Sequence, residues 1–192
     1  NMSDNLDDIL QSSSRFEIAN WLRMRSLIID LPAFNALIVH AGIWPGFDFQ
    51  KSISNNDFVY QQLSGDLWEN YLSEVFKNEP NNWDECNSET EKLRFIINSS
   101  TRMRFVDKSS FALDFKEKKF PGNPNSNLVP WMNVPNSFHI ERQIIFGHWA
   151  TLQGNYRTSK AHGIDTGYVW HGYLTAVRLD DRKIFMVKND KC

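Results

Sequence analysis

Cysteine is scarce in this 192-residue sequence. Its two cysteines, Cys86 and Cys192, stand far apart, and neither has a partner at a metal-binding spacing such as C-x-x-C. The sequence therefore excludes a cysteine-based zinc motif. The same scarcity is typical of a protein from a reducing compartment.

Long apolar runs and a charge of one sign are also missing. No window approaches the roughly 18 uninterrupted apolar residues of a membrane helix. The N-terminus, NMSDNLDDIL, is too acidic and polar for a signal peptide, so we expect a cytoplasmic protein without a membrane partner. The 21 Lys and Arg residues and the 23 Asp and Glu residues are scattered along the chain, so no basic surface indicates nucleic-acid binding. The charged runs KEKK (116–119) and DDRK (180–183) are expected on solvated loops.

Apolar and aromatic residues are plentiful, and they allow a sizeable core. They make up 41% of the chain and include seven Trp and fourteen Phe, which suits one domain over residues 1–192. Helical spacing of apolar residues predicts helices over 4–26 and 55–76, the second one interrupted at Gly65. Between them, LIID and ALIV read as a β-hairpin around the proline-containing turn LPAFN.

The second half of the chain changes character. The segment ETEKLRFIINSSTRMRF begins as a helix, and residues 121–136, rich in Pro and Gly, predict an irregular insertion crossing the surface. Four short runs then follow, and we expect them to be consecutive strands of one sheet: RQIIFGH, GIDTGY, YLTAVRL and KIFMV. Helices first and strands later indicate the α+β class rather than a doubly wound α/β fold.

Two histidines end apolar, strand-like runs. His40 closes the run ALIV in VHAGIWPGFD, and His148 closes IIFGH in RQIIFGHWATLQG. A histidine on a strand is often only a hydrogen-bonded core residue. However, both stand at strand ends among small residues, which would let a ligand or metal approach the backbone closely. The pair therefore predicts a transition-metal site, since neutral imidazole nitrogens bind such ions.

Asp165, in the triplet DTG, follows an apolar residue. Two interpretations are open for it: it caps a turn, or its carboxylate orients a metal-bound histidine without binding the metal itself. The remaining histidines rank low. His162 lies in polar KAHG and is expected to be exposed, while His139 and His171 are expected in a loop and a turn.

Three arginines cluster in LRFIINSSTRMRF, namely Arg94, Arg102 and Arg104. One interpretation is a helix face with solvated ends. The other is phosphate binding: the alternation around apolar Met103 puts Arg102 and Arg104 on one side of an extended segment, where two guanidinium groups repel unless an anion joins them. Trp83, in NNWDE, either covers the core or stacks on a planar ligand. We keep Arg94 and Trp83 as candidate substrate-binding residues.

Taken in order, HAGIWPGFD, NNWDE, LRFIINSSTRMRF, FGHWATLQG and GIDTGYVWHGYLTAVRL resemble the C-terminal two thirds of the bacterial symmetrical diadenosine tetraphosphatases. These enzymes belong to the phosphoprotein-phosphatase branch of the calcineurin-like metallophosphoesterases. The resemblance runs from about residue 16 to residue 187. TRMRF and FGHWA are specific to the subfamily, whereas HAGI marks only the broader phosphatase group.

The resemblance implies a β-sandwich flanked by helices and two divalent metal ions, commonly manganese or cobalt, at the strand ends. It implies hydrolysis of diadenosine tetraphosphate to two ADP. The metal-binding histidines of the family fall on His40 and His148. The arginine that holds the scissile phosphate falls on Arg102 or Arg104, which the resemblance does not separate, and Asp165 falls on the family's DTG.

The family's other metal-binding motifs, GD-x-HG, GD-x-V-x-RG and GNHD, do not occur in this sequence. We therefore expect a partial metallophosphoesterase fold that lacks the N-terminal strands and their ligands, with weak metal binding and negligible hydrolysis. Exposed strand edges and apolar surface would follow, with poor solubility or pairing with another chain. Two alternatives stay open: a non-catalytic nucleotide- or partner-binding module, and a phosphoprotein phosphatase of broader specificity.

Overall fold

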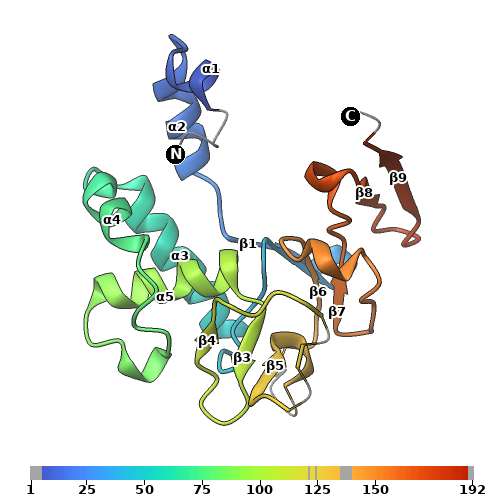
Figure 1. Ribbon diagram of the computed structural model, residues 1–192. Helices are drawn as coiled ribbons and strands as arrows, with labels where there is room; N and C mark the ends of the chain where they lie inside the picture. Colours follow the sequence, from blue (N-terminus) through green and yellow to red (C-terminus); the bar gives the residue numbers. More distant parts are fainter. Residues whose placement is uncertain (1–5, 121, 124, 135–139, 190–192) are drawn as a thin grey trace.

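The computed structural model describes residues 6–120, 122–123, 125–134 and 140–189. Helices and sheets occur in the same chain, with most α-helix in the first half (Figure 1). The mixed fold expected from the sequence is therefore present. The α-helices are α1 (Asp7–Leu10), α2 (Arg15–Arg23), α3 (Phe49–Ser64), α4 (Trp68–Val75) and α5 (Glu89–Arg102).

The N-terminal helix predicted over 4–26 is instead two short helices. A turn separates α1 from α2, and within it the hydroxyl of Ser12 accepts a hydrogen bond from the backbone N–H of Ser14 at 3.1 Å. Serine competes for backbone hydrogen bonds in this way, which explains the break. Residues 4 and 5 of the predicted helix lie outside the described residues.

The other helices begin and end where local signals indicate. Asp48 caps α3 by accepting a hydrogen bond from the N–H of Lys51 at 2.7 Å, and Gly65 ends it, as predicted. Ser88 and Glu91 form a reciprocal capping box at the start of α5. A small core joins α3, α4 and α5 through Val59, Val75, Leu93 and Ile96.

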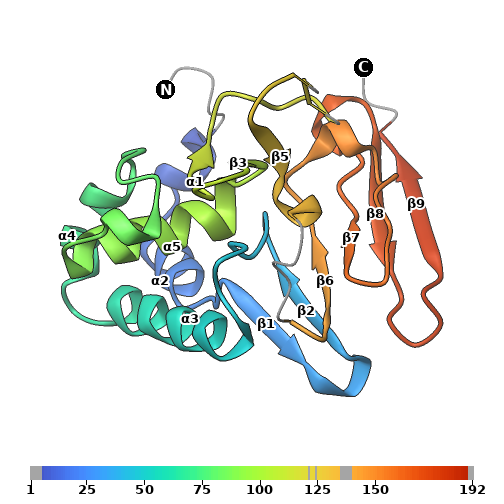
Figure 2. The same ribbon diagram turned by 90° about the horizontal axis from the view of Figure 1, so that it is seen from below.

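The central sheet has the strand order β1-β2-β6-β7 (Figure 2). Strands β1 (Ile28–Leu31) and β2 (Ala36–Val39) form the predicted antiparallel hairpin, joined by the 3-10 turn η1 (Pro32–Phe34). Strand β2 then pairs in parallel with β6 (Gln143–Phe146), in a register that sets Val39 opposite Phe146. Since the carboxyl ends of parallel strands meet at one edge, the residues after β2 and after β6 emerge side by side.

The expectation of one sheet from the last four runs is wrong. RQIIFGH supplies β6, but its parallel neighbour β7 (Ala161–Gly163) comes from KAHG. The rest of GIDTGY forms no strand and contributes only isolated bridges from Thr166 and Gly167 to Tyr173. Strands β8 (Tyr173–Val177) and β9 (Ile184–Lys188) form a separate antiparallel hairpin. His162, expected to be exposed, lies in β7 and is only 2% exposed, because pairing with β6 draws this polar segment into the sheet.

A second sheet has the order β4-β3-β5, from β3 (Phe105–Asp107), β4 (Leu113–Asp114) and β5 (Leu128–Pro130). Its Phe105 shares the main core with Leu37 and Ile144 of the central sheet. The segment 121–136 is not only a surface crossing, because it contains β5 and η3 (Trp131–Asn133), where Trp131 is fully buried. Residues 121, 124, 135 and 136 of that segment lie outside the described residues. Three further short helical turns are η2 (Trp83–Glu85), η4 (Ala150–Leu152) and η5 (Tyr168–Trp170).

Apolar side chains are exposed at the edges of the fold. They lie on α2, on the edge strand β1 and on the terminal hairpin, and include Phe16, Trp21, Ile29, Leu174 and Val187. Figure 1 shows α1 and α2 on one side of the molecule and the β8–β9 hairpin on the other. Within the described ranges, no helix has the length and apolar character to span a membrane.

Candidate functional site

Two imidazole rings meet at the carboxyl ends of β2 and β6. His40 is the first residue after β2, and His148 is the second after β6. Although 108 residues separate them in the sequence, their ring centroids lie 5.1 Å apart, with the planes tilted by 53°. The parallel pairing of the two strands is what brings them together, and the hydrogen bond from the Gly147 N–H to the His40 carbonyl, 2.9 Å, extends that pairing to the rings.

The His148 backbone and side chain are both constrained. Its φ of 62° lies in the left-handed region, which is costly for a non-glycine residue and is often found at functional sites. The ring atom Nε2 lies 3.2 Å from the Arg102 carbonyl. A carbonyl can only accept, so Nε2 carries the proton and donates it there, and Nδ1 keeps its lone pair for another partner.

The two small residues after His40 serve packing. Ala41 is buried, and a Cβ built on Gly42 would lie 2.6 Å from the indole of buried Trp131. The sequence predicts that Ala41 and Gly42 leave room for a ligand. The space is instead filled by Trp131 and Met103, so Gly42 lets the core pack closely at this point.

Loss of hydration and nearby positive charge lower the pKa of both imidazoles, although the His40 residue itself remains exposed. The pKa of His148 falls from 6.5 to about 4, chiefly because burial removes water, with repulsion from Arg104 and His40 adding to the effect. The pKa of His40 is also lowered by loss of hydration, which the carboxylate of Asp165 opposes and Arg104 reinforces. Since a metal ion binds the neutral ring, both histidines are in the ligand-competent form near neutral pH.

The structure distinguishes the positions of Arg102 and Arg104, which the sequence alone does not. Arg102 is the last residue of α5, not part of an extended segment, and its guanidinium donates to Asn98 and Asn78, each at 3.0 Å, while lying over the Phe115 ring. Arg104 lies beyond the helix and donates weakly to the His148 carbonyl at 3.4 Å. The charge of Arg104 lowers the pKa of both imidazoles, whereas that of Arg102 acts on His148.

Asp165 closes a turn, which is the first of its two predicted readings, while its role in orienting a metal-bound histidine stays a prediction. Its Oδ1 accepts a hydrogen bond from the Gly167 N–H at 2.9 Å, which closes the turn after it. Its charge also acts on His40 and Arg104, whose pKa it raises against the lowering effect of burial. The carboxylate thus supplies the negative charge next to the imidazole–guanidinium group.

Trp83 and Arg94 are placed elsewhere by the fold. Trp83 packs its ring against Phe47 and Phe95, with centroids 5.0 and 5.8 Å away. Arg94 is 7% exposed and donates to the backbone carbonyls of Glu74 and Glu79, each at 2.6 Å. These contacts hold the core and α4, and the structure does not bring either residue together with the histidines.

The remaining histidines add no ligand to the pair. His171 is exposed in a turn, as predicted, and His139 lies outside the described residues. Across the described ranges, no group of three or more His, Cys, Asp or Glu side chains could hold a metal ion. Sequence reasoning missed Asn98 as the partner of Arg102, although its position one helical turn earlier is the spacing that signals such a contact.

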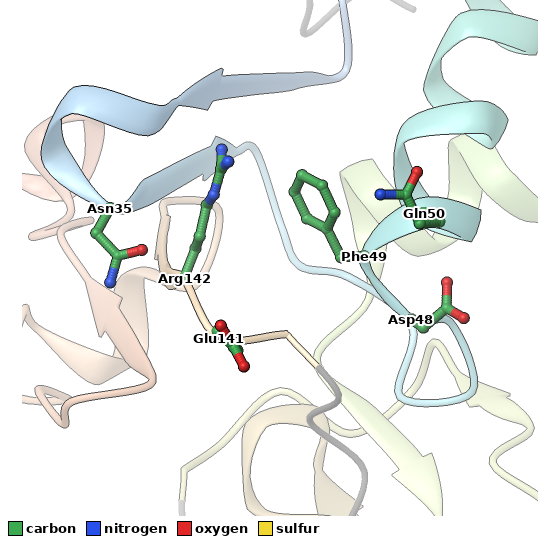
Figure 3. A pocket seen from close by; sticks show the side chains of 6 residues that line it. All are labelled: Asn35, Asp48, Phe49, Gln50, Glu141 and Arg142. Atoms are coloured by element: carbon green, nitrogen blue, oxygen red, sulfur yellow. The ribbon is translucent and has the colours of Figure 1, made fainter.

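A hollow of about 530 Å³ lies at the opposite end of β2 and β6 from the histidines (Figure 3). In it Arg142 lies over the Phe49 ring, with its cation 4.7 Å from the centroid, and forms an ion pair with Asp30. Asp48 in its wall is already used as the cap of α3. Because these charges are paired within the protein, the imidazole pair is the stronger candidate site.

Sequence comparison gives one consistent group of relatives. The chain is 36% identical over 184 residues to a symmetrical bis(5'-nucleosyl)-tetraphosphatase of Legionella pneumophila strain Corby, covering 96% of this chain and 66% of that protein. It is 37% identical over 188 residues to the protein of that name from Bordetella pertussis, covering 97% and 66%. For the one from Glaesserella parasuis the identity is 35% over 187 residues, covering 96% and 68%. The chain therefore spans about two thirds of the length of these relatives.

Other comparisons add little. A crystal structure assigned provisionally as a diadenosine tetraphosphatase superposes with a TM-score of 0.48 and 18% identity, covering 95% of this chain and 63% of that one. A likeness at that level carries no weight for fold or function. No family model matches the chain.

Proposed function

The chain belongs to the family of symmetrical bis(5'-nucleosyl)-tetraphosphatases, and from that premise we propose that it takes part in hydrolysing dinucleoside polyphosphates, with diadenosine tetraphosphate giving two ADP. One observation carries the proposal: the rings of His40 and His148 meet at 5.1 Å beside the Arg104 guanidinium. A pair of neutral imidazoles next to a fixed positive charge suits a metal ion and a phosphate together.

The imidazole pair fits part of a divalent metal site, for which we propose manganese or cobalt in a two-ion centre. His148 would bind through Nδ1, since its Nε2 proton is held by the Arg102 carbonyl. Such a backbone partner fixes the ring and raises its basicity as a ligand. When bound, paired divalent ions polarise the phosphate and lower the pKa of a water molecule, which makes that water the nucleophile.

Arg104 is the proposed phosphate-binding residue. Burial lowers its pKa, but Asp165 opposes that effect, and an arginine stays charged at neutral pH. Its planar fork can donate two hydrogen bonds to phosphate oxygens and offset the charge that develops during hydrolysis. Arg102 would contribute through its carbonyl, which orients His148, while its side chain remains with Asn78 and Asn98.

Two imidazoles alone are a poor metal site, because catalytic ions usually have three or more protein ligands. We propose that further ligands come from a segment corresponding to the third of the relatives' length that this sequence does not span. The chain by itself would then bind metal weakly and hydrolyse its substrate slowly. An added segment that carries the ligands would restore the rate.

The test is hydrolysis of diadenosine tetraphosphate with manganese or cobalt, followed by chromatography of ADP. The 192-residue chain would be assayed alone and mixed with the unmatched segment of the Legionella pneumophila relative. We expect negligible turnover from either alone and ADP production from the mixture, abolished by His148→Ala. Robust turnover by the chain alone, sensitive to His148→Ala, would refute the proposed incompleteness. A mixture without activity would count against the hydrolase function.

A second candidate is a nucleotide-binding module without hydrolysis. It is favoured by one observation, the lack of a third ligand near the histidines among the described residues. Under this alternative, ADP binds and Arg104→Ala weakens that binding, but the mixture described above releases no product. The same assay therefore separates the two functions.

A further inference from the structure

A second hollow, of about 570 Å³, lies directly beside the imidazole site. It forms where the turn after His148 meets the turn after Asp165. Its lining residues come from those two turns alone: Ala150, Thr151, Gln153, Thr166, Gly167, Trp170, His171 and Gly172. Since adjacent Cα atoms are about 3.8 Å apart, Thr166 and Ala150 bring this wall within one or two residues of Asp165 and His148.

The two turns are fastened to each other. The Gly154 N–H donates to the Asp165 carbonyl at 3.1 Å, and a Cβ on Gly167 would rest 3.6 Å from the Ala150 Cβ. Gly172 donates to the Gly167 carbonyl at 2.9 Å and has no room for a side chain, because a Cβ would lie 2.0 Å from the Thr166 carbonyl. The hollow is thus a built feature that keeps a fixed position relative to the site.

Trp170 forms one wall of the hollow while remaining 77% exposed. A tryptophan left this open presents a large flat aromatic surface to solvent, and stacking against a planar ring removes that surface from water. The other turn contributes exposed Gln153 to the lining, whose amide can both donate and accept hydrogen bonds. One aromatic platform with a few polar groups, in a volume between about 300 and 1,000 Å³, is typical of a small-molecule site.

We propose that this hollow binds a purine base of the substrate, with Trp170 stacked on the base and Gln153 hydrogen-bonded to its edge. The inference rests on the proposed function, because it joins the base to a polyphosphate lying along Arg104 and the imidazoles. A base in the hollow and a phosphate at the imidazoles would belong to one nucleotide, since the two turns carry both sites. The occupant is therefore a purine nucleotide such as ADP rather than a free phosphate or a peptide.

The experiment titrates the ¹⁵N-labelled chain with ADP and, separately, with inorganic pyrophosphate, which lacks the base. Seven tryptophans give seven indole N–H signals, and Trp170→Phe identifies that of Trp170 by its loss. We expect the Trp170 signal to shift with ADP and not with pyrophosphate. No shift with ADP up to about 10 mM, a range that captures millimolar affinities, or an equal shift with both ligands, overturns the proposal.

Affinity measurements on variants give a second readout. Trp170→Ala should weaken ADP binding by about 5- to 150-fold, the range that base–aromatic stacking supplies, and Trp170→Phe should restore most of it. Val169→Ala is the matched control, because Val169 is equally exposed at 77% and does not line the hollow. Pyrophosphate affinity should not change in any of the three. Equal weakening of ADP and pyrophosphate by Trp170→Ala, or no weakening of ADP, overturns the stacking role.

The outcomes for this site and for the proposed function are distinguishable. Suppose that the mixture of this chain with the segment of the Legionella pneumophila relative hydrolyses no substrate, while the Trp170 signal still responds to ADP and not to pyrophosphate. The hydrolase function then fails and the base site stands. If hydrolysis occurs and Trp170→Ala changes neither ADP affinity nor the KM for diadenosine tetraphosphate, the function stands and the base site fails.

Discussion

Protonation of His148 should destabilise the fold, and replacing it by asparagine should remove that effect. The folded protein holds the pKa of this imidazole at about 4, against 6.5 for an ordinary histidine, mainly through burial. Asparagine is a suitable replacement because, like histidine, it tolerates the left-handed backbone found at position 148. It does not titrate, so it separates charge from backbone conformation.

The magnitude follows from the two pKa values. Between 6.5 and about 4 the unfolded chain binds the proton and the folded chain does not, so stability is full above about pH 6.5 and falls as the pH drops toward 4. At 1.36 kcal/mol per pKa unit the complete effect is about 3.4 kcal/mol. At about pH 5, roughly 2 kcal/mol of it should be lost relative to about pH 7.5.

The assay is urea unfolding at these two pH values, with a chelator present so that metal does not contribute. The free energy of unfolding of the natural chain should decrease by about 2 kcal/mol more than that of His148→Asn. His171→Asn serves as the matched control, since His171 has the same left-handed backbone and an exposed side chain. Its pH dependence should equal that of the natural chain. An equal pH dependence in His148→Asn would refute the claim that burial keeps this ring neutral.

Three further substitutions test the packing and the charges around the site. In the same urea assay, Gly42→Ala should lower the free energy of unfolding by about 1–3 kcal/mol, because the new methyl group meets a buried indole. Gly147→Ala is the control: its methyl group would make only ordinary contacts, so the free energy of unfolding should change by less than about 1 kcal/mol. Arg94→Ala should cost about 3 kcal/mol of stability by leaving two carbonyl acceptors unpaired, and calorimetry should show unchanged ADP affinity; a weakened affinity would return Arg94 to the substrate site. Arg104→Ala should weaken pyrophosphate binding by about 10- to 100-fold and Arg102→Ala by much less, so equal losses would contradict the separation of the two arginines.

Local sequence signals predicted local structure well. The β1–β2 hairpin followed from two apolar runs around Pro32, and the end of α3 followed from Gly65, because neighbouring residues determine turns and helix ends. The strand-end positions of His40 and His148 could also be read from the sequence. The prediction that the two histidines share one site followed from these positions and from the family resemblance, and their ring centroids lie 5.1 Å apart.

Tertiary pairing determined what the sequence did not reveal. KAHG reads as a polar loop, yet three of its residues form β7 because β6 offers a free edge, and that pairing buries His162. The difference between Arg102 and Arg104 depends on the helix ending between them, which a spacing pattern does not locate. The role of Gly42 was likewise hidden, since Trp131 reaches it from 89 residues further along the chain.

The parallel pairing of β2 with β6 also affects how the protein folds. It joins Ala36 to Gln143 across 107 residues, whereas the hairpin and the helices between them need only short-range contacts. Closing a flexible loop of that length costs about 4 kcal/mol in chain entropy, which the contacts formed afterwards must offset. The helices can therefore fold early, while the two imidazoles come together only in a late, slow step of folding.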